Sequence, residues 1–251
     1  MATPIDISEE AGVRYLHFGS TWIQGAMRIA RPWNLELEYT REMMASLLLR
    51  DDARWPRKVL LIGLGAASLT KFLYRNYPLA HLTVVEIEPA VVAAARQFFK
   101  LPEDPRRVNI VIDDGAEYML NHDKKFDLIL VDGYDENARS DTTNTLPFYQ
   151  ACRARLNETG VTVFNLLTSH RRFDDHIKRI AEAFDDRLLV FPSCESGNAI
   201  AFAAAGHPIE ISFDTLKENA LTLKDATGLN LLSTLTRLAQ AKTCLHDTLT
   251  L

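Results

Sequence analysis

The stretch KVLLIGLG, residues 58–65, decides the fold class. Four apolar residues, Val59–Ile62, lead into Gly63 and Gly65, and the next segment, ASLTKFLYRNY (67–77), is helix-like. A strand without polar alternation is buried on both faces, which is typical of a parallel sheet covered by helices. The stretch therefore predicts the first strand, turn and helix of an α/β domain.

Strand-length apolar runs of the same kind recur downstream, each followed by a helix-like segment. They are HLTVVEIE (81–88), VNIVIDD (108–114), FDLILVDG (126–133) and GVTVFNLL (160–167). The last two runs, RLLVFPS (187–193) and AIAFAAA (199–205), are separated by CESGN alone, which predicts a β-hairpin. Five strand–helix units closed by a hairpin predict an α/β fold. Its sheet would be doubly wound, mostly parallel and seven-stranded, of the class I S-adenosylmethionine-dependent (Rossmann-like) type.

The chain divides into three predicted regions. Residues 1–35 are expected to form a small N-terminal antiparallel β region, because 13–30 alternate loosely, like two or three short strands. Residues 36–206 would form the Rossmann-like domain, introduced by a helix over 36–50 with one apolar face. Residues 207–251 are expected to form a C-terminal helical tail.

Composition excludes several classes of function. The 251 residues carry a formal net charge of -5, so no overall basic field is available for nucleic acid or an anionic membrane. The first residues, MATPIDISEE, are acidic without a visible signal peptide, and no apolar run is long enough to cross a bilayer. The three cysteines lie far apart and the seven histidines form no HxH or HExxH motif. We therefore expect a cytoplasmic protein without a metal site.

Acidic residues end three of the predicted parallel strands. Glu86 and Glu88 close the second strand, where a carboxylate can accept both hydroxyl groups of a ribose; strand alternation does not choose between them. Asp113 and Asp114 end the third strand, where an aspartate can contact an adenine amino group or cap the next helix.

Asp132 ends the fourth strand. Ligands of open α/β sheets bind beyond the carboxyl ends of the strands, where the strand order reverses. The first and fourth strands flank that point, so Asp132 should lie beside the turn at Gly63–Gly65. Four acids and one base within 132–141 would form a cradle for a cationic substrate, the alternative being a solvated polar loop.

Several segments together resemble the polyamine aminopropyltransferase (spermidine synthase) family, between about Tyr15 and Ala205. They include KVLLIGLGAAS (58–68), LEYTREMM (37–44), VVEIEPAVVAAARQFFKLP (84–102), EDPRRVNIVIDDGAEYM (103–119), VDGYDEN (131–137) and PFYQACRARLNETGV (147–161). The resemblance implies that five residues contact the nucleoside, with a glutamate on the ribose: Gly63, Gly65, Glu86, Asp114 and Gly115. It also implies Asp132 as the general base, and Asp135, Tyr134 and Tyr39 as contacts of the amine.

The sequence departs from the family pattern mainly around the amine. Ala66 stands where the family's loop carries an aspartate that grips the aminopropyl ammonium. Thr40 and Arg41 stand where a tyrosine and then histidine or glutamine are usual, with Tyr39 one place early, and Cys194 replaces a late tyrosine. The N-terminal glutamine that touches the nucleoside in the family has no clear counterpart.

The resemblance implies transfer of an aminopropyl group from decarboxylated S-adenosylmethionine to a polyamine such as putrescine, with release of methylthioadenosine. It also implies a homodimer or homotetramer. Two alternatives stay open. One is a methyltransferase, because Ala66 would not repel the carboxylate of intact S-adenosylmethionine and Arg41 could pair with it. The other is a non-catalytic nucleoside-binding member of the family. The sequence does not identify the acceptor amine.

Overall fold

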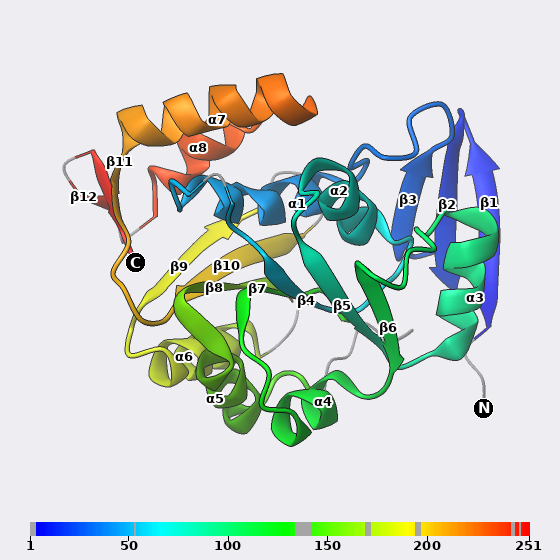
Figure 1. Cartoon of the computed structure of the whole chain (residues 1–251), viewed down its shortest axis with the longest axis horizontal. Coiled ribbons are helices and arrows are strands. Elements are labelled where there is room, and N and C mark those ends of the chain that lie inside the picture. The colour runs from blue at the N-terminus through cyan, green and yellow to red at the C-terminus, as the bar shows by residue number, and fades with distance from the viewer. Residues whose placement is uncertain are drawn as a thin grey trace.

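The computed structural model describes residues 4–52, 54–133, 142–168, 172–193, 197–241, 244–245 and 247–251. Seven strands form the central sheet: β4 (Lys58–Ile62), β5 (His81–Glu86), β6 (Val108–Ile112), β7 (Phe126–Val131), β8 (Leu156–Leu167), β9 (Leu188–Pro192) and β10 (Asn198–Ala204). Their order is β6-β5-β4-β7-β8-β10-β9 (Figure 1). β10 runs antiparallel to β8 and β9, and the remaining pairings are parallel. The predicted doubly wound sheet with a terminal hairpin is confirmed.

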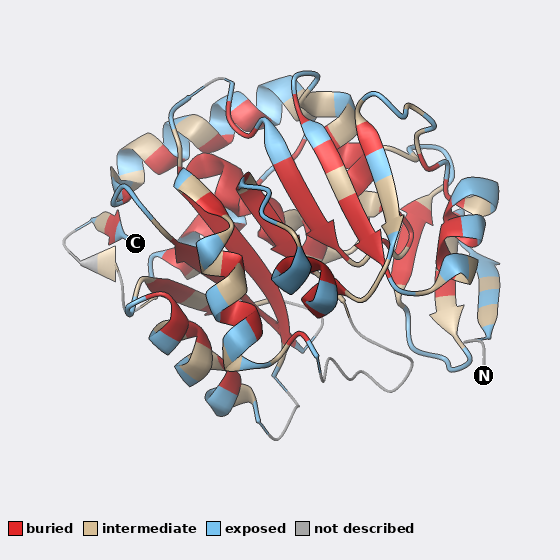
Figure 2. Ribbon diagram, turned by 60° about the horizontal axis from the view of Figure 1, so that its bottom comes forward, coloured by how far each residue is buried: buried red, intermediate tan, exposed pale blue. Residues whose placement is uncertain are grey.

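Helices cover both faces of the sheet and bury it. One face carries α2 (Ser68–Asn76) and α3 (Pro89–Phe98), and the other carries α4 (Gly115–Asn121), α5 (Leu146–Ala154) and α6 (Phe173–Ala183). Figure 2 shows the central strands almost entirely in the colour of buried residues. Burial on both faces explains why these strands read as unbroken apolar runs.

A separate three-stranded antiparallel sheet lies at the N-terminus: β1 (Ile5–Glu10), β2 (Val13–Phe18) and β3 (Gly25–Arg28). Its inner residues Leu16 and Met27 pack against Ala66 and Phe99, so the small sheet sits on the turn after β4 and on the end of α3. Strands are predicted from the sequence within 13–30, and β1 lies before that range. β1 has the sequence IDISEE and is largely exposed, and its only apolar residues are two isoleucines, too few to predict a strand.

The segment expected as one helix over 36–50 is shorter and in two parts. It forms α1 (Glu38–Met43) and then the 3₁₀ helix η1 (Met44–Leu48). Glu42 of α1 is fully buried and forms an ion pair with Arg237. Because a buried carboxylate is costly unless it is paired, this contact ties α1 to the C-terminal part of the chain.

The C-terminal region is helical as expected but also contains strands. It holds α7 (Phe213–Thr227), α8 (Leu232–Leu238) and a small antiparallel sheet of β11 (Glu210–Ser212), β12 (Cys244–Leu245) and β13 (Thr248–Thr250). Strands of two or three residues are too short to show an apolar alternation, so this sheet could not be predicted from the sequence. Both helices contribute leucines to the core on the α2 face, including Leu216 and Leu235.

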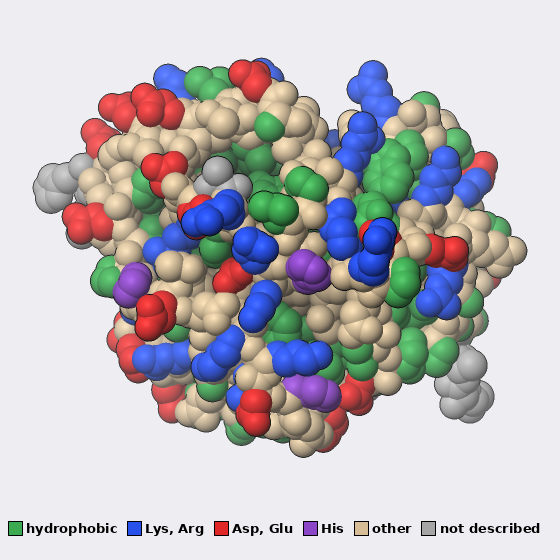
Figure 3. Space-filling model, in the orientation of Figure 1, with side chains coloured by type: hydrophobic (Ala, Val, Ile, Leu, Met, Phe, Trp, Pro, Cys, Tyr) green, Lys and Arg blue, Asp and Glu red, His purple; other side chains and the backbone are tan. Residues whose placement is uncertain are grey.

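The surface has a mixed character. Figure 3 shows lysine and arginine side chains on one face, with acidic, hydrophobic and histidine side chains between and around them. Several basic side chains form exposed ion pairs, such as Arg54 with Asp52 and Arg106 with Asp104. Exposed pairs of this kind contribute little stability, so the free energy of folding comes mainly from the buried sheet. No helix in the described ranges is long and apolar enough to span a membrane.

Replacement of Phe202 by alanine tests the dominance of this core. Phe202 is completely buried on β10 and packs edge-on against Phe191, with 5.4 Å between ring centroids. We expect Phe202→Ala to lower the free energy of unfolding by about 3–5 kcal/mol, because it removes apolar contacts and leaves a cavity. Chemical denaturation measures the loss. Leu221→Ala, at a position 42% exposed, is the control and should change stability by about 0.5 kcal/mol or less. Equal losses in the two variants would contradict this account.

Candidate functional site

The ends of β4 and β7 meet at the centre of the site. The backbone N–H of Asp132 donates to the carbonyl of Ile62, with 2.9 Å between N and O. Gly63 has φ +95°, and a Cβ added to it would lie 2.2 Å from the Asp132 carbonyl oxygen. A side chain at residue 63 is therefore excluded both by conformation and by space. The expectation that Asp132 lies beside the Gly63–Gly65 turn is confirmed.

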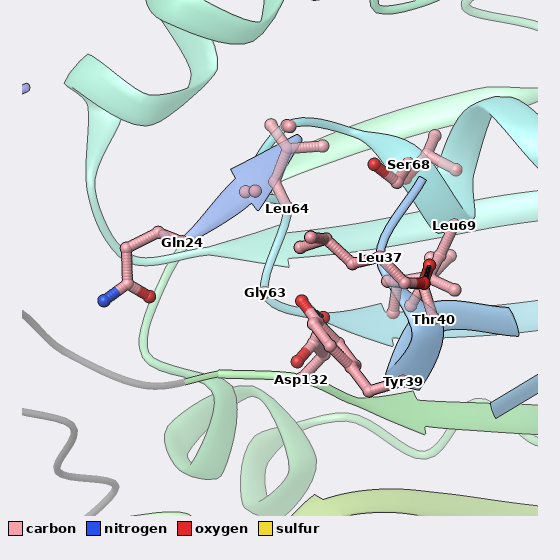
Figure 4. A pocket seen from close by; sticks show the side chains of 14 residues that line it. Gln24, Leu37, Tyr39, Thr40, Gly63, Leu64, Ser68, Leu69 and Asp132 are labelled. Atoms are coloured by element: carbon pink, nitrogen blue, oxygen red, sulfur yellow. Dashed lines mark hydrogen bonds between the residues drawn. The ribbon is translucent and has the colours of Figure 1, made fainter. Parts of the chain in front are cut away.

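The Asp132 side chain is half-buried and accepts two hydrogen bonds. The Tyr39 hydroxyl donates to Oδ2 at 3.1 Å, and the Asn165 amide Nδ2 donates to Oδ1 at 2.8 Å. Figure 4 shows the Tyr39 and Asp132 side chains next to each other below Gly63. Burial raises the pKa of Asp132 above its ordinary value, and the two donors oppose that rise because they favour the carboxylate. A carboxylate with a raised pKa is suited to accept a proton near neutral pH.

Tyr39 reaches this position from the first turn of α1. Thr40, the next residue, also lines the pocket, but its hydroxyl donates to the carbonyl of Leu37 at 2.6 Å. Arg41 donates to the carbonyl of Leu35 and pairs with Glu38, so its guanidinium is engaged within its own segment. The tyrosine that stands one place early in the sequence is thus the one whose hydroxyl meets Asp132.

A pocket opens between the turn after β4, the start of α1 and the N-terminal sheet. The residues that line it include Gln24, Leu37, Tyr39, Gly63, Leu64, Gly65, Ala66, Ser68 and Asp132. Gly65 has φ +50°, and a Cβ there would be 3.2 Å from the Gln24 carbonyl oxygen. Asp132 is the charged side chain in this described lining. The backbone of the Gly63–Gly65 turn therefore lines one side of the pocket, and the Asp132 carboxylate lines another.

The two glutamates at the end of β5 have different surroundings. Glu86 is 7% exposed, and its carboxylate accepts backbone N–H groups of Leu64 and Glu88 at 2.9 and 3.0 Å. Burial raises its pKa, against the lowering effect of those bonds. Glu88 caps α3 through Ala90 instead. Glu86 is therefore the glutamate that faces the glycine turn, and the remaining lone pairs of its oxygens can accept hydroxyl groups.

Asp114 and Gly115 begin α4. Asp114 Oδ1 accepts from the backbone N–H of Ala116 and Glu117, and Oδ2 accepts from the Thr142 hydroxyl at 3.1 Å. Asp114 is thus the helix cap, the role that the sequence analysis kept open for one of the two aspartates. A Cβ at Gly115 would lie 2.4 Å from Ile62 Cγ2, so the start of α4 also abuts the end of β4.

Two predicted amine contacts, Tyr134 and Asp135, lie outside the described residues. Three residues near Asp132 were not expected from the sequence: Gln24 at the pocket, and the buried pair Asn165 and Asn198, joined by a 2.6 Å hydrogen bond. The one sequence signal for Asn165 is a polar residue inside the otherwise apolar run GVTVFNLL. Gln24 gave no signal, because its approach to the turn depends on how the small sheet packs.

Replacement of Gly63 by alanine tests the close approach of the two strand ends. We expect Gly63→Ala to lower the free energy of unfolding by more than about 3 kcal/mol, since it combines left-handed strain with a backbone clash. Gly228→Ala is a matched control: its φ is +78°, and nothing lies within 4 Å of an added Cβ. It should cost about 1 kcal/mol. Denaturant unfolding measures the free energy of unfolding of both variants. Similar losses of stability in the two would show that the contact between Gly63 and Asp132 is not tight.

The chain matches the spermine/spermidine synthase domain family over residues 37–186. A curated relative, the polyamine aminopropyltransferase of Chromobacterium violaceum, is 36% identical over 236 residues, which are 94% of this chain and 89% of that protein. This similarity covers the large sheet and at least part of the N-terminal one.

Two solved structures share the fold. A probable spermidine synthase from Corynebacterium glutamicum has a TM-score of 0.71 at 19% identity, covering 90% of this chain and 91% of that one. Human Methyltransferase-like protein 13, in complex with SAH, has a TM-score of 0.69 at 24% identity, covering 77% and 93%. At this identity the likeness shows the fold alone, which proteins with both kinds of name share. The domain match and the close relative decide the assignment: the chain belongs to the spermine/spermidine synthase family, the polyamine aminopropyltransferases.

Proposed function

We propose that the protein transfers an aminopropyl group from decarboxylated S-adenosylmethionine to a polyamine such as putrescine and releases methylthioadenosine. The observation that carries the proposal is the half-buried Asp132, held by Tyr39 and Asn165 at the edge of the pocket. Membership of the aminopropyltransferase family supports the same reaction.

The described residues fit a nucleoside donor. Gly63 and Gly65 line the pocket with backbone atoms and without a side chain, so a ligand can approach the turn closely. Glu86, fixed by two backbone amides, would accept the ribose hydroxyl groups. Asp114 and Gly115, at the start of α4, would contact the adenine. These five contacts are proposals that rest on the family resemblance together with this geometry.

The chemistry requires a proton acceptor because a protonated amine cannot attack. Asp132 would remove one proton from the acceptor ammonium, for which burial prepares it by raising its pKa. The freed nitrogen lone pair then forms a bond to the propyl carbon, the carbon–sulfur bond breaks, and its electrons neutralise the sulfonium. Much of the remaining rate gain would come from alignment of nitrogen, carbon and sulfur, since the sulfonium is already a good leaving group.

The acceptor site would recognise a cation. Asp132 supplies the negative charge in the described lining of the pocket, and Tyr39 adds an aromatic ring and a hydroxyl beside it. We propose that Tyr134 and Asp135, which follow Asp132 in the sequence, complete this site. A small diamine meets these requirements, because one nitrogen can lie against the base while the other keeps its charge.

Methyl transfer is disfavoured by the surroundings of Arg41. That guanidinium would have to pair with the carboxylate of intact S-adenosylmethionine, yet it is bonded to Leu35 and Glu38 and does not line the pocket. Ala66, the other basis for that alternative, packs against Gly25 of β3. The family assignment also favours aminopropyl transfer.

We further propose that the enzyme works in the cytoplasm as a homodimer or homotetramer, without a metal ion. The proposed regions are an N-terminal β region to residue 35, a nucleoside-binding catalytic domain over 36–206 and a C-terminal region from 207. These proposals follow from composition and from the family resemblance.

The donor preference tests the proposed function. We expect methylthioadenosine release when decarboxylated S-adenosylmethionine and putrescine are supplied together, and tighter binding of the decarboxylated donor than of intact S-adenosylmethionine. Calorimetry measures binding, and chromatography measures the nucleoside product. Preference for the carboxylated donor, or methyl transfer to any amine, would replace this proposal with a methyltransferase. Binding of methylthioadenosine without turnover on putrescine, spermidine or cadaverine would indicate a non-catalytic member.

Replacement of Asp132 by asparagine tests the base. We expect Asp132→Asn to lower kcat by about 10²- to 10⁴-fold and to leave methylthioadenosine affinity nearly unchanged, because shape is kept and proton acceptance is lost. Wild-type activity should fall on the acid side at a pH above the range of an ordinary aspartate, since the ionised form is active and burial raises its pKa. Asp127→Asn, at the opposite end of β7, is the control and should retain kcat. Normal turnover by Asp132→Asn would rule out this role.

A further inference from the structure

A row of three polar side chains extends from Asp132 into the sheet. Asn165, near the end of β8, donates through Nδ2 to Asp132 Oδ1 at 2.8 Å. Asn198, the first residue of β10, donates through Nδ2 to Asn165 Oδ1 at 2.6 Å. Both asparagines are nearly buried, with exposed fractions of 5% and 7%. They lie on adjacent antiparallel strands, whose backbone ladder fixes their spacing.

The charge of Asp132 dictates the direction of this row. An ionised carboxylate only accepts hydrogen bonds, so Asn165 must present its amide NH₂ to Asp132. Its amide oxygen then faces Asn198, which must donate to it. A rotation of the Asn165 amide by half a turn would place its oxygen against the carboxylate and its NH₂ against the Asn198 donor. Both contacts would be repulsive, so Asn198 and the Asp132 carboxylate favour the same orientation, and Asn198 adds to the cost of rotating the amide.

We propose that Asn198 is a positioning residue that holds Asn165 in the one amide orientation that donates to Asp132. Asn198 does not line the pocket, so it acts on the reaction solely through Asn165. The role in catalysis rests on the proposed function, whereas the effect on the Asp132 carboxylate does not. In the described part of the chain, Tyr39 is the titratable side chain that contacts Asp132. Glu86 lies on another strand with its carboxylate bound to backbone amides.

The orientation matters because burial and hydrogen bonding oppose each other at Asp132. Asn165 and Tyr39 are the two donors that favour its ionised form inside the protein. With Asn198 intact, both donors are available. Without it, the Asn165 amide can turn, and the carboxylate retains Tyr39 alone. The pH at which Asp132 becomes a working base should then rise.

Two substitutions at Asn198 separate donor loss from donor reversal. Asn198→Leu keeps nearly the same size and removes the donor. Asn198→Asp keeps the shape, but when ionised it only accepts, so it draws the Asn165 NH₂ away from Asp132. We expect the Asp132 carboxyl to titrate about one pH unit higher in Asn198→Leu and higher still in Asn198→Asp. Carbon-detected NMR of protein labelled at aspartate carboxyls measures this, with the Asp132 signal assigned by its loss in Asp132→Asn.

The pH profile of turnover provides the second readout. The acid limb of kcat/KM for the amine should move to higher pH by the same amount, with unchanged methylthioadenosine affinity. Asn198→Gln, which retains an amide donor, should restore much of the wild-type profile. Thr162→Val is the matched control on β8: Thr162 is completely buried and its hydroxyl has no partner among the described residues. It should leave both the titration and the profile unchanged.

The outcomes keep the two proposals apart. An Asp132 titration that coincides in wild type, Asn198→Leu and Asn198→Asp would overturn the role of Asn198, whatever the activity. An equal shift in Thr162→Val would also overturn it, because the effect would then be a general disturbance of the strand pair. A shifted titration in a protein that releases no methylthioadenosine would support the positioning role and reject the proposed function.

Discussion

The whole site depends on how closely the end of β4 approaches the exit of β7. A hydrogen bond from the Asp132 backbone to Ile62 joins the two strand ends, and the space beside Gly63 admits no side chain. Gly115 abuts Ile62 from the other side. Because these contacts are between backbone atoms or very short side chains, they leave little freedom. The carboxylate of Asp132 therefore lies at a fixed place beside the Gly63–Gly65 turn.

Much of this arrangement could be predicted because periodicity and strand order are local or topological properties. The runs KVLLIGLG and FDLILVDG identify buried parallel strands, and the switch in strand order brings Gly63 and Asp132 together. What could not be predicted depends on side-chain packing between distant segments. Tyr39 meets Asp132 because the first turn of α1 lies against the end of β7, and Gln24 reaches the pocket because the small sheet rests on Ala66.

The two halves of the site are built in different ways. The proposed nucleoside side uses backbone amides and a glutamate fixed by them, which tolerates few changes. The proposed amine side uses single side chains from α1, from the end of β7 and from β8, and these can be exchanged more freely. This difference explains why the chain keeps the family's glycine turn and strand-end acids while it departs from the usual pattern around the amine. It also explains why the fold, shared with a methyltransferase-like protein, does not by itself specify the group that is transferred.

The contact between Gly25 and Ala66 couples β3 to the turn after β4, two segments that are far apart in the sequence. A methyl group added at Gly25 would come within 2.6 Å of the Ala66 side chain. A larger side chain at Gly25 requires the segment around Ala66 to move. We therefore expect that an aspartate at position 66 does not fit while the N-terminal sheet keeps its present position. The side chain at position 66 and the position of the small sheet are therefore coupled. An attempt to graft the standard loop into this chain would have to bring the matching N-terminal strands with it.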